Sequence, residues 1–462
     1  MNSALLFVFV LVETFAITAL TAELKPVVEA EEDVYSYAAA NNGAGPMWCA
    51  GSTCLVRVGE KVFASGLETL PDAKPLNNCC WVLFQRTNNG WTRLRVDANG
   101  RTREPSPLAC FHDGTVLLSA NPTLGKGTEP NGGPTRPEIL QFSAANPTRE
   151  PGQLAPTWQG APQFSEHSYR SFAADGAKSE FVLFQNIGYT HAEWTFRDGD
   201  GRWRAQGQLK WPWGAEYDKP QPIRICYPNV ALKNRAVYFF GVSDIVEPYQ
   251  AWRDYKKQVT GKEWDYDFRR LFYTWTADIT KEPFREWVEI ASRDKSCGGV
   301  WPCDLWLAPD QSVHLLWTER AIDERLRDKF FPEAKQSHAL HYAIVRDGKI
   351  VRRRALVESI EGKPGIIASA GRFQVTPDNR LFTIFYAAGI GDDGKRISEN
   401  RSVELRADGS TTVPVRLPLT KPFINYFTAT VRAGSPPSRT LEMLGQCEGT
   451  PMTISYARVR LF

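Results

Sequence analysis

The sequence lacks the short motifs that mark several large enzyme classes. Its 462 residues contain no glycine-rich phosphate-binding loop, no Gly-x-Ser-x-Gly nucleophile turn and no His-Glu-x-x-His zinc motif. The formal net charge of +3 is too small to indicate nucleic-acid binding. The run of three arginines at 352–354 fits the solvent face of a strand better than a docking patch. We therefore expect no nucleic acid as a partner.

Long apolar segments are absent after the first 22 residues. Residues 4–21 form an apolar stretch that is interrupted only by Glu13 and ends in small residues. This pattern is typical of a secretory signal peptide. An uncleaved membrane anchor is the alternative, but a charge near the centre of a span is costly. We expect a signal peptide at 1–22, a secreted or periplasmic protein, and no membrane association after cleavage.

The nine cysteines are an odd number and lack the paired Cys-x-x-Cys spacing of a zinc ribbon. In an exported protein some should pair and at least one should remain free. Cys297 and Cys303 are the best candidates for a local disulfide, and a structural zinc site that joins them to Cys226 is the alternative. The Asp-Gly-Asp-Gly sequence at 198–201 could hold a structural Ca²⁺, although a hairpin turn explains it better.

The composition is rich in aromatic residues, at 12%, and contains 35 glycines and 31 prolines. This mixture fits many short strands that are joined by tight turns. Helical periodicity is nearly absent. Residues 247–262 and 322–335 are the only helical candidates, and both are interpreted as insertions.

One pattern recurs along the chain: two β-rich segments joined by a two-residue turn. Turns such as Asp113-Gly114 and Asp378-Asn379 permit the positive φ that tight hairpins need. Seven copies follow one another at intervals of about 60 residues, and each is followed by further strand-like sequence. The turns lie at 59–60, 113–114, 175–176, 233–234, 310–311, 378–379 and 434–435.

Four strands in each of seven units predict an all-β fold: a seven-bladed β-propeller with four-stranded antiparallel blades around a central channel. Residues 453–461 are strand-like and should share a blade with an N-terminal strand, which would close the ring and remove free edges. Two stacked β-sandwich domains are the alternative, but they do not explain a turn that recurs at a nearly fixed interval. Residues 23–462 are therefore expected to form a single domain.

The face opposite the seven turns is the predicted site, because both insertions, 245–270 and 320–337, fall on it. Long loops on a rigid scaffold commonly carry function. His167 and His191 should reach this rim together, whereas His112 and His314 lie beside turns and are expected to be structural. Other side chains expected at the rim are Asn186, Tyr227, Asp244, Asp304, Glu319, Arg372, Tyr426 and Gln446. Such a rim suits an anionic polysaccharide, with aromatic rings for stacking and cations for carboxylate or sulfate.

Several segments resemble one family of propellers. They include SEHSYRSFAADG, NIGYTHAEW, RICYPNVAL, WDYDFRRLFYTW and CDLWLAPDQSVHLLWTER. The chain, most strongly over 165–385, is similar to the BNR-repeat propeller family that includes the ulvan lyases. The resemblance implies β-elimination at a uronate, in which a cation neutralises the carboxylate, a base removes the C5 proton and an acid protonates the leaving oxygen at C4. It implies that no cofactor is required for catalysis.

Carried over to this sequence, the resemblance makes His167 and His191 the catalytic histidines. Tyr255 and Arg270 are the best matches for the tyrosine and arginine of the site. If Arg270 lay beside Tyr255, the cation would lower the pKa of the tyrosine and help it act as a base. The competitors for these two roles are Tyr227, Tyr249 and Tyr266, and Arg224 and Arg269.

The expected substrate is a uronate-containing, ulvan-like polysaccharide, which can carry sulfate groups. The protein that binds it is expected to be a monomer. The residues predicted to bind this substrate are Asn186, Arg224, Tyr227, Arg320 and Arg372.

Two other functions fit the same fold. A sialidase-like glycoside hydrolase needs a carboxylate pair, or a tyrosine nucleophile with three arginines. Asp244, Asp304 and Glu319 are available acids, but the Ser-x-Asp-x-Gly-x-Thr-Trp box of sialidases is missing from every turn. A non-catalytic carbohydrate-binding propeller would need the same rim without a reactive His/Tyr pair. The fold alone does not decide among these functions.

Overall fold

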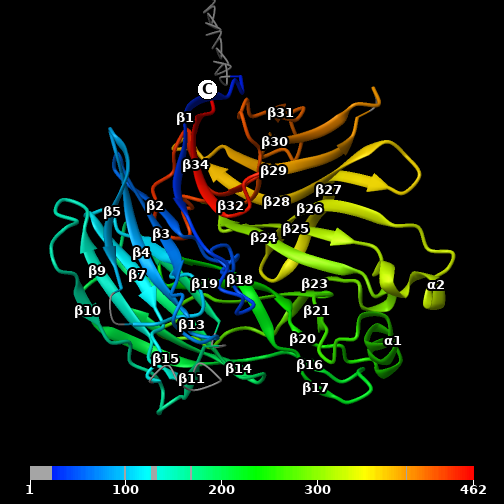
Figure 1. Ribbon diagram of the computed structural model, residues 1–462, viewed down its shortest axis with the longest axis horizontal. Coiled ribbons are helices and arrows are strands. Elements are labelled where there is room, and N and C mark those ends of the chain that lie inside the picture. The colour runs from blue at the N-terminus through cyan, green and yellow to red at the C-terminus, as the bar shows by residue number, and fades with distance from the viewer. Residues whose placement is uncertain (1–22, 98–99, 126–132, 167–168, 392) are drawn as a thin grey trace, which may run out of the picture.

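The computed structural model describes residues 23–97, 100–125, 133–166, 169–391 and 393–462. The predicted signal peptide at 1–22 lies outside the described residues. Seven four-stranded antiparallel sheets form a ring (Figure 1), and this confirms the predicted seven-bladed β-propeller. No helix in the described ranges is long and apolar enough to span a membrane.

The first strand of each blade lies at the ring centre and the fourth at the outside. Blade 1 contains β2 (Leu55–Val58), β3 (Lys61–Thr69), β4 (Cys79–Thr87) and β5 (Gly90–Val96). Blade 2 contains β6 (Leu108–Cys110), β7 (Thr115–Ala120), β9 (Glu138–Ser143) and β10 (Gly152–Leu154). Blade 3 contains β12 (Arg170–Asp175), β13 (Glu180–Ile187), β14 (His191–Arg197) and β15 (Trp203–Lys210). Blade 4 contains β18 (Ile225–Lys233), β19 (Ala236–Ser243), β22 (Arg270–Thr276) and β23 (Val288–Ser292).

The remaining blades follow the same order. Blade 5 contains β24 (Gly299–Leu307), β25 (Val313–Arg320), β26 (Ser337–Arg346) and β27 (Lys349–Ile360). Blade 6 contains β28 (Gly365–Val375), β29 (Leu381–Ile390), β30 (Arg396–Leu405) and β31 (Val415–Arg416). Blade 7 contains β32 (Phe423–Thr428), β33 (Thr440–Cys447), β34 (Thr453–Arg460) and β1 (Val27–Ser36). Three short two-stranded sheets lie in the loops between blade strands. They are β8 (Pro134–Thr135) with β11 (Phe164–Ser165), β16 (Trp213–Gly214) with β17 (Gln221–Pro222), and β20 (Ile245–Val246) with β21 (Tyr266–Asp267).

Each of the seven predicted turns lies in the connection between the first and second strands of a blade. Asn234 and Asn379 adopt φ values of 49° and 59°, the left-handed region that asparagine tolerates. Gly434 has φ 87°, and a Cβ atom there would lie 1.9 Å from the carbonyl oxygen of Cys110. Only glycine therefore fits this position, where the β32–β33 connection crosses the ring centre.

The ring closes by pairing the two ends of the chain. The N-terminal strand β1 pairs antiparallel with the C-terminal strand β34, from Val27 opposite Arg460 to Ser36 opposite Thr453. The two strands run side by side in Figure 1. The closure predicted for residues 453–461 is thus confirmed. It leaves blade 7 with four strands, as in every other blade.

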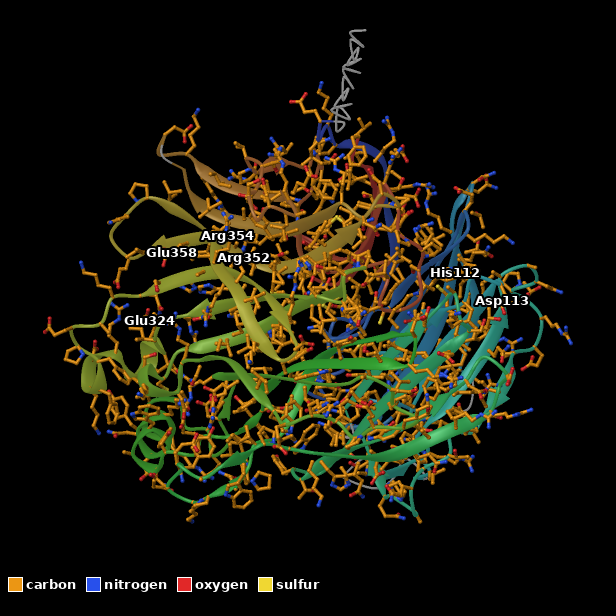
Figure 2. The ribbon with its side chains drawn as sticks, turned by 180° about the vertical axis from the view of Figure 1, so that it is seen from behind. His112, Asp113, Glu324, Arg352, Arg354 and Glu358 are labelled. Carbon is orange, nitrogen blue, oxygen red and sulfur yellow. The ribbon has the colours of Figure 1, made fainter. Side chains whose placement is uncertain are left out.

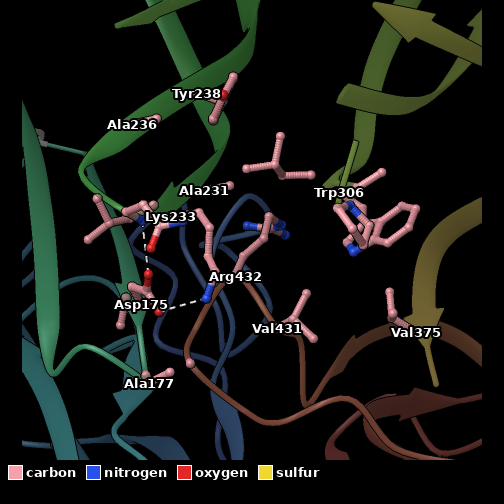
Figure 3. A pocket seen from close by; sticks show the side chains of 18 of the residues that line it. Asp175, Ala177, Ala231, Lys233, Ala236, Tyr238, Trp306, Val375, Val431 and Arg432 are labelled. Atoms are coloured by element: carbon pink, nitrogen blue, oxygen red, sulfur yellow. Dashed lines mark hydrogen bonds and ion pairs between the residues drawn. The ribbon is translucent and has the colours of Figure 1, made fainter. Parts of the chain in front are cut away.

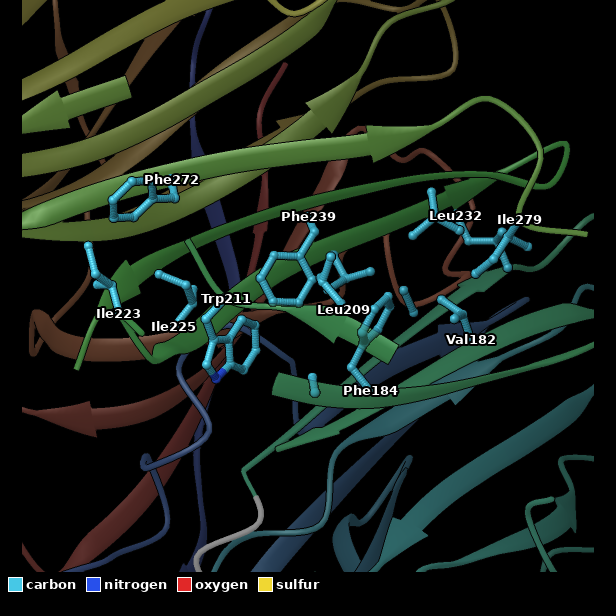
Figure 4. Close-up of a cluster of buried hydrophobic side chains, with 14 of the residues drawn as sticks. Val182, Phe184, Leu209, Trp211, Ile223, Ile225, Leu232, Phe239, Phe272 and Ile279 are labelled. Carbon is cyan, nitrogen blue, oxygen red and sulfur yellow. The ribbon is translucent and has the colours of Figure 1, made fainter. Parts of the chain in front are cut away.

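The core lies between neighbouring blades. Between blades 3 and 4, Phe184 and Phe239 are fully buried and their ring centroids lie 5.2 Å apart, with Trp211 packed against Phe239 (Figure 4). Burial of each such phenylalanine contributes roughly 1.5–3 kcal/mol. The three arginines at 352–354 lie on β27, the outermost strand of blade 5 (Figure 2), where residues 352 and 353 are exposed as predicted.

The middle of the predicted channel is filled. The segment 42–54, called here the plug, enters from the face opposite the seven turns before β2 begins. Arg432 reaches the plug from the β32–β33 connection and donates hydrogen bonds to the carbonyl oxygen of Gly51, at 3.1 Å, and to Asp304, at 2.8 Å. The plug and this buried ion pair separate a funnel on one face from a cavity on the other.

Both predicted insertions are helical and contact each other. The first contains α1 (Gln250–Thr260), and the second contains a 3-10 turn (Glu324–Leu326) followed by α2 (Arg327–Phe330). The rings of Tyr255 and Phe330 pack 5.7 Å apart, and Trp252 packs on Phe331. An ion pair of 2.9 Å joins Arg325 to Asp265. Together they build up one face of blades 4 and 5, called here the insertion face; the opposite face is the turn face.

Candidate binding and catalytic funnel

A cavity of about 590 Å³ opens at the centre of the insertion face. It is called here the funnel. Trp48 and Met47 of the plug form one side. Residues of the first strands of blades 4 to 7 line the rest, together with Tyr37 after β1, Phe268 before β22 and Gln446 near the end of β33. The aromatic and long polar side chains that line it are Tyr37, Trp48, Tyr227, Phe268, Trp301, Arg372, Asn425 and Gln446.

Tyr227 is the centre of an aromatic platform in the funnel. Its ring centroid lies 5.0 Å from that of Trp301, 5.9 Å from that of Trp48 and 6.1 Å from that of Phe268. Its φ of 50° is unusual for a bulky residue and lies where the β18–β19 pairing is irregular, between Cys226 and Asn229. Burial raises the pKa of Tyr227, so its hydroxyl stays neutral. Sugar rings stack on such surfaces through their apolar faces.

The funnel wall also carries a positive charge with little to balance it. Arg372 is buried and donates hydrogen bonds to the carbonyl oxygens of Cys303, Gly371 and Ala50, which have no formal charge. The neighbouring carboxylate of Asp304 is paired with Arg432. Burial lowers the pKa of Arg432, Asp304 opposes this effect, and repulsion from Arg372 adds to it. Two cations therefore surround one anion at the base of the funnel.

A second arginine is enclosed by tyrosines next to the platform. The guanidinium of Arg224 lies 4.0 Å from the ring centroid of Tyr189, 5.5 Å from that of Tyr266 and 5.6 Å from that of Tyr169. Tyr169 in turn packs 5.7 Å from Tyr227, which connects this group to the funnel. Arg224 also forms an ion pair of 3.0 Å with Asp244.

The hydroxyl groups of Tyr189 and Tyr266 are 3.0 Å apart and hydrogen-bonded. Both side chains remain accessible, with exposed fractions of 44% and 37%. Burial, and then the bond to Tyr189, raise the pKa of Tyr266 to about 12, so Tyr266 keeps its proton at neutral pH. An accessible phenol that holds its proton is suited to act as a general acid.

The structure brings together some of the predicted site residues. Tyr227 and Arg372 line the funnel, and Arg224 adjoins it through Tyr169. Asn186 is buried and donates a hydrogen bond of 3.1 Å to the carbonyl oxygen of Ile225, which ties blade 3 to blade 4. Arg320 is exposed at the end of β25.

His191 begins β14, close in the chain to Tyr189. Its Nε2 lies 3.1 Å from Glu193, and its Nδ1 lies 2.8 Å from the hydroxyl of Thr190. A carboxylate only accepts hydrogen bonds, so Glu193 favours the tautomer with the proton on Nε2, and the lone pair on Nδ1 then accepts from the hydroxyl of Thr190. His167 lies outside the described residues.

Tyr255 and Arg270 are not brought together. Tyr255 packs on Phe330 in the insertions, with the Lys329 ammonium 4.5 Å from its ring centroid. Arg270 begins β22 and pairs with Glu289 and Glu216 on the flank of blade 4. The expected lowering of the pKa of Tyr255 by Arg270 therefore has no basis in this geometry.

The three acids predicted at the rim all form ion pairs with arginine. Asp304 is fully buried and bound to Arg432, and Asp244 is bound to Arg224. Glu319 is bound to Arg293 and Arg353. Tyr426, also predicted at the rim, is fully buried in the core between blades. His314 is structural as predicted: it hydrogen-bonds Tyr342 at 2.6 Å, and burial lowers its pKa to about 4.

The predicted disulfide between Cys297 and Cys303 is wrong. The Sγ of Cys297 accepts a hydrogen bond of 3.0 Å from Arg269, whereas the Sγ of Cys303 donates to the carbonyl oxygen of Trp301. No disulfide joins any of the nine cysteines in the structure, all of which lie in the described ranges. Within the described ranges no group of three or more His, Cys, Asp or Glu side chains is arranged to hold a metal ion. At 198–201, Asp198 caps a hairpin turn by accepting from the backbone N–H of Arg202, which fits the turn interpretation.

A slightly larger cavity, about 640 Å³, opens on the turn face (Figure 3). Its wall is formed by small residues such as Ala231 and Ala236 and by the turns themselves. Tyr238 and Trp306 line it but are only 8% and 7% exposed. Lys233 forms an ion pair of 3.0 Å with Asp175 at its edge. In the funnel Tyr227 is equally buried, at 8%, but Trp48, Phe268 and Trp301 around it are partly exposed. We favour the funnel as the functional site because of these three rings and the unbalanced cation of Arg372.

No family model matches the chain, and no curated protein matches it. Similar solved structures include an α-L-arabinanase of Penicillium chrysogenum complexed with arabinobiose (12% identity over 95% of this chain and 99% of that chain, TM-score 0.42). The α-L-arabinofuranosidase of Fusarium graminearum with arabinobiose gives 10% identity over 94% and 98%, with a TM-score of 0.43. A mutant of the Synechocystis apocarotenoid oxygenase gives 9% over 92% and 88%, also at 0.43. At these low values the likeness carries no argument about activity, and the resemblance to the BNR-repeat family stays a prediction.

Proposed function

We propose that the funnel binds an anionic, uronate-containing polysaccharide and that the protein cleaves it by β-elimination. The observation that carries this proposal is the combination of the Tyr227 aromatic platform with Arg372, whose hydrogen-bond acceptors are neutral carbonyls. The platform offers stacking surface for sugar rings. The unbalanced positive charge in a poorly solvated wall favours a ligand that brings a carboxylate.

The proton transfers are assigned to Tyr266, beside Arg224, and to His191, at the start of β14. In β-elimination a base takes the C5 proton, the electron pair forms the C4–C5 double bond, and the C4–oxygen bond breaks. Tyr266, which keeps its proton, is suited to protonate the leaving oxygen. His191, oriented by Glu193 with a lone pair on Nδ1, is the candidate base. Tyr189 hydrogen-bonds Tyr266 and holds it in place.

The engaged acids favour a lyase over a glycoside hydrolase. A hydrolase of the usual type needs two carboxyl groups that flank the bond to be cleaved. Asp244, Asp304 and Glu319 are each bound to arginine, so their carboxylate oxygens are already engaged within the protein. β-Elimination needs no such pair.

The test is an ultraviolet assay of the purified protein with ulvan and other uronate polysaccharides. The unsaturated product absorbs, so an increase in absorbance reports β-elimination. We expect this increase in the wild type and a loss of about 10²–10⁴-fold in kcat for Tyr266→Phe and for His191→Ala. The matched controls are Tyr255→Phe, on α1, and His338→Ala, on β26, which should keep the wild-type rate.

Three other outcomes would reassign the catalytic acid, the reaction or the function. A loss in Tyr255→Phe with none in Tyr266→Phe would move the acid role to the insertion. New reducing ends without absorbance would mean hydrolysis and contradict the proposal. Saturable binding with neither signal would leave a carbohydrate-binding propeller.

A further inference from the structure

The plug contains two cysteines whose sulfur atoms are in contact. Cys49 and Cys54 are separated by four residues, and their Sγ atoms lie 3.6 Å apart. The backbone between them forms a tight turn, in which the N–H of Ser52 donates to the carbonyl oxygen of Cys49 at 3.0 Å. The two sulfur atoms are therefore already in van der Waals contact.

The surroundings make this pair different from the other cysteines. All nine cysteines lie in the described part of the chain, and Cys49 is the only one that is not buried. The contact with Cys54, and then burial, raise the pKa of the Cys49 thiol, which lowers its reactivity in the folded protein. By contrast, Cys79 and Cys80 are consecutive residues of β4, whose side chains point to opposite faces of the sheet.

The turn from Cys49 to Cys54 also contacts blades 3, 6 and 7. The carbonyl oxygen of Ala50 accepts from Arg372 and that of Gly51 accepts from Arg432. Ser52 accepts from the N–H of Phe172, and Thr53 donates to the carbonyl oxygen of Thr428. Trp48, directly before Cys49, stands in the funnel against Tyr227. A covalent link across this turn would fix both the plug and the ring of Trp48.

We propose that Cys49 and Cys54 are a disulfide site that fastens the plug in the mature, exported protein. The two thiols lose two protons and two electrons as the sulfur–sulfur bond forms. A disulfide donor, small or protein-bound, takes them up and is reduced to two thiols. The proposal does not depend on the activity of the funnel.

The test uses the full-length protein exported to an oxidising compartment and purified without reductant. The protein is denatured in a thiol-alkylating reagent and digested with trypsin. No lysine or arginine lies between Lys25 and Arg57, so one peptide carries Cys49 and Cys54 and no other cysteine. We expect this peptide to be two hydrogen atoms lighter than the dithiol form and unlabelled, and to take two labels after reduction. The peptide with Cys79 and Cys80 should take two labels before reduction. Two labels on the Cys49–Cys54 peptide before reduction would overturn the proposal.

A second measurement tests the role of the bond. Reduction should lower the Tm of the wild type by about 3 °C and leave the Tm of Cys49→Ser unchanged. Cys447→Ser is the matched control, because it removes a buried thiol elsewhere and should keep the wild-type response to reductant. A bond whose reduction leaves the wild-type Tm unchanged would overturn its role in fastening the plug.

Discussion

The two faces of the propeller differ in what their connections do. On the turn face, the connections between first and second strands are mostly tight turns, and they enclose a cavity with alanine-rich walls. On the insertion face, the plug and two helical insertions surround aromatic rings and buried cations. Both cavities are of similar size, at about 590 and 640 Å³. Chemistry rather than volume therefore distinguishes the faces.

The largest expected effect concerns the ion pair between the two faces. Arg432→Met would leave the fully buried carboxylate of Asp304 without its partner. Breaking a buried pair in this way costs about 3–5 kcal/mol, so the free energy of unfolding in urea should fall by that amount. A fall below about 1 kcal/mol would show that Arg432 does not hold the plug and that the faces are not separated in this way.

The next effect concerns pH and the base of the first insertion. Asp267 is fully buried beside Arg269, Glu247, Asp294 and Lys256, and burial raises its pKa from 3.8 to about 7. Between these values Asp267 keeps its proton only in the folded state. The free energy of unfolding should therefore fall as the pH rises from about 4 to about 7, by a few kcal/mol, and then level off.

Asp267→Asn tests this because an amide does not titrate. Urea unfolding at a series of pH values should show a flatter profile for this variant than for the wild type between pH 4 and 7. Asp198→Asn, in a turn-face hairpin, is the comparison. Burial opposes the hydrogen bonds from Arg202 and Arg204 there, and the net effect lowers the pKa of Asp198. That variant should therefore keep the wild-type fall. Equal profiles for wild type and Asp267→Asn would contradict the assignment.

A smaller effect separates substrate binding at the two faces. Trp48→Ala removes one ring of the funnel platform. Aromatic stacking contributes about 1 kcal/mol, so KM for the uronate polymer should rise about fivefold while kcat changes little. Lys233→Ala, at the turn-face cavity, should leave KM unchanged. The reverse pattern in steady-state kinetics would move the binding site to the turn face.

The smallest effect is on stability at the turn face. The ion pair of Lys233 with Asp175 is half-exposed on the lysine side. The Asp175 carboxylate is buried, but without Lys233 it keeps the hydrogen bond from the backbone N–H of Asn234, so the loss should be about 1 kcal/mol. Lys233→Ala should therefore shift the urea midpoint only slightly. A loss as large as that of Arg432→Met would show that the two faces contribute alike to stability.

The fold could be predicted from the sequence because the turn residues that mark each blade are neighbours in the chain. Turns such as Asp378-Asn379 need a positive φ that few residues adopt, and their spacing counted seven blades. The plug was not predicted. Its sequence has neither strand nor helix periodicity, and its conformation depends on contacts with distant partners such as Arg372 and Arg432. Such long-range contacts have no local sequence signal.

The candidate site was predicted in part. Tyr227 and Arg372 were identified from their places a few residues before the turns of blades 4 and 6, inside β18 and β28. Arg224 was identified as a competitor for the arginine role that the resemblance implies. Tyr189 was missed, although it lies two residues before His191 in the same connection. The adjacent Arg269 and Arg270 could have been separated by strand alternation, which sends successive side chains to opposite faces. Arg269 is accordingly buried with Asp267 and Glu247, and Arg270 lies on the blade flank.

The most direct test of the account is a crystal structure of Tyr266→Phe with a uronate oligosaccharide. This variant should bind the oligosaccharide without cleaving it. The account predicts sugar density in the funnel, stacked on Trp48 or Tyr227, with a carboxylate directed at Arg372 or Arg224. Sugar density in the turn-face cavity beside Trp306, with an empty funnel, would contradict it.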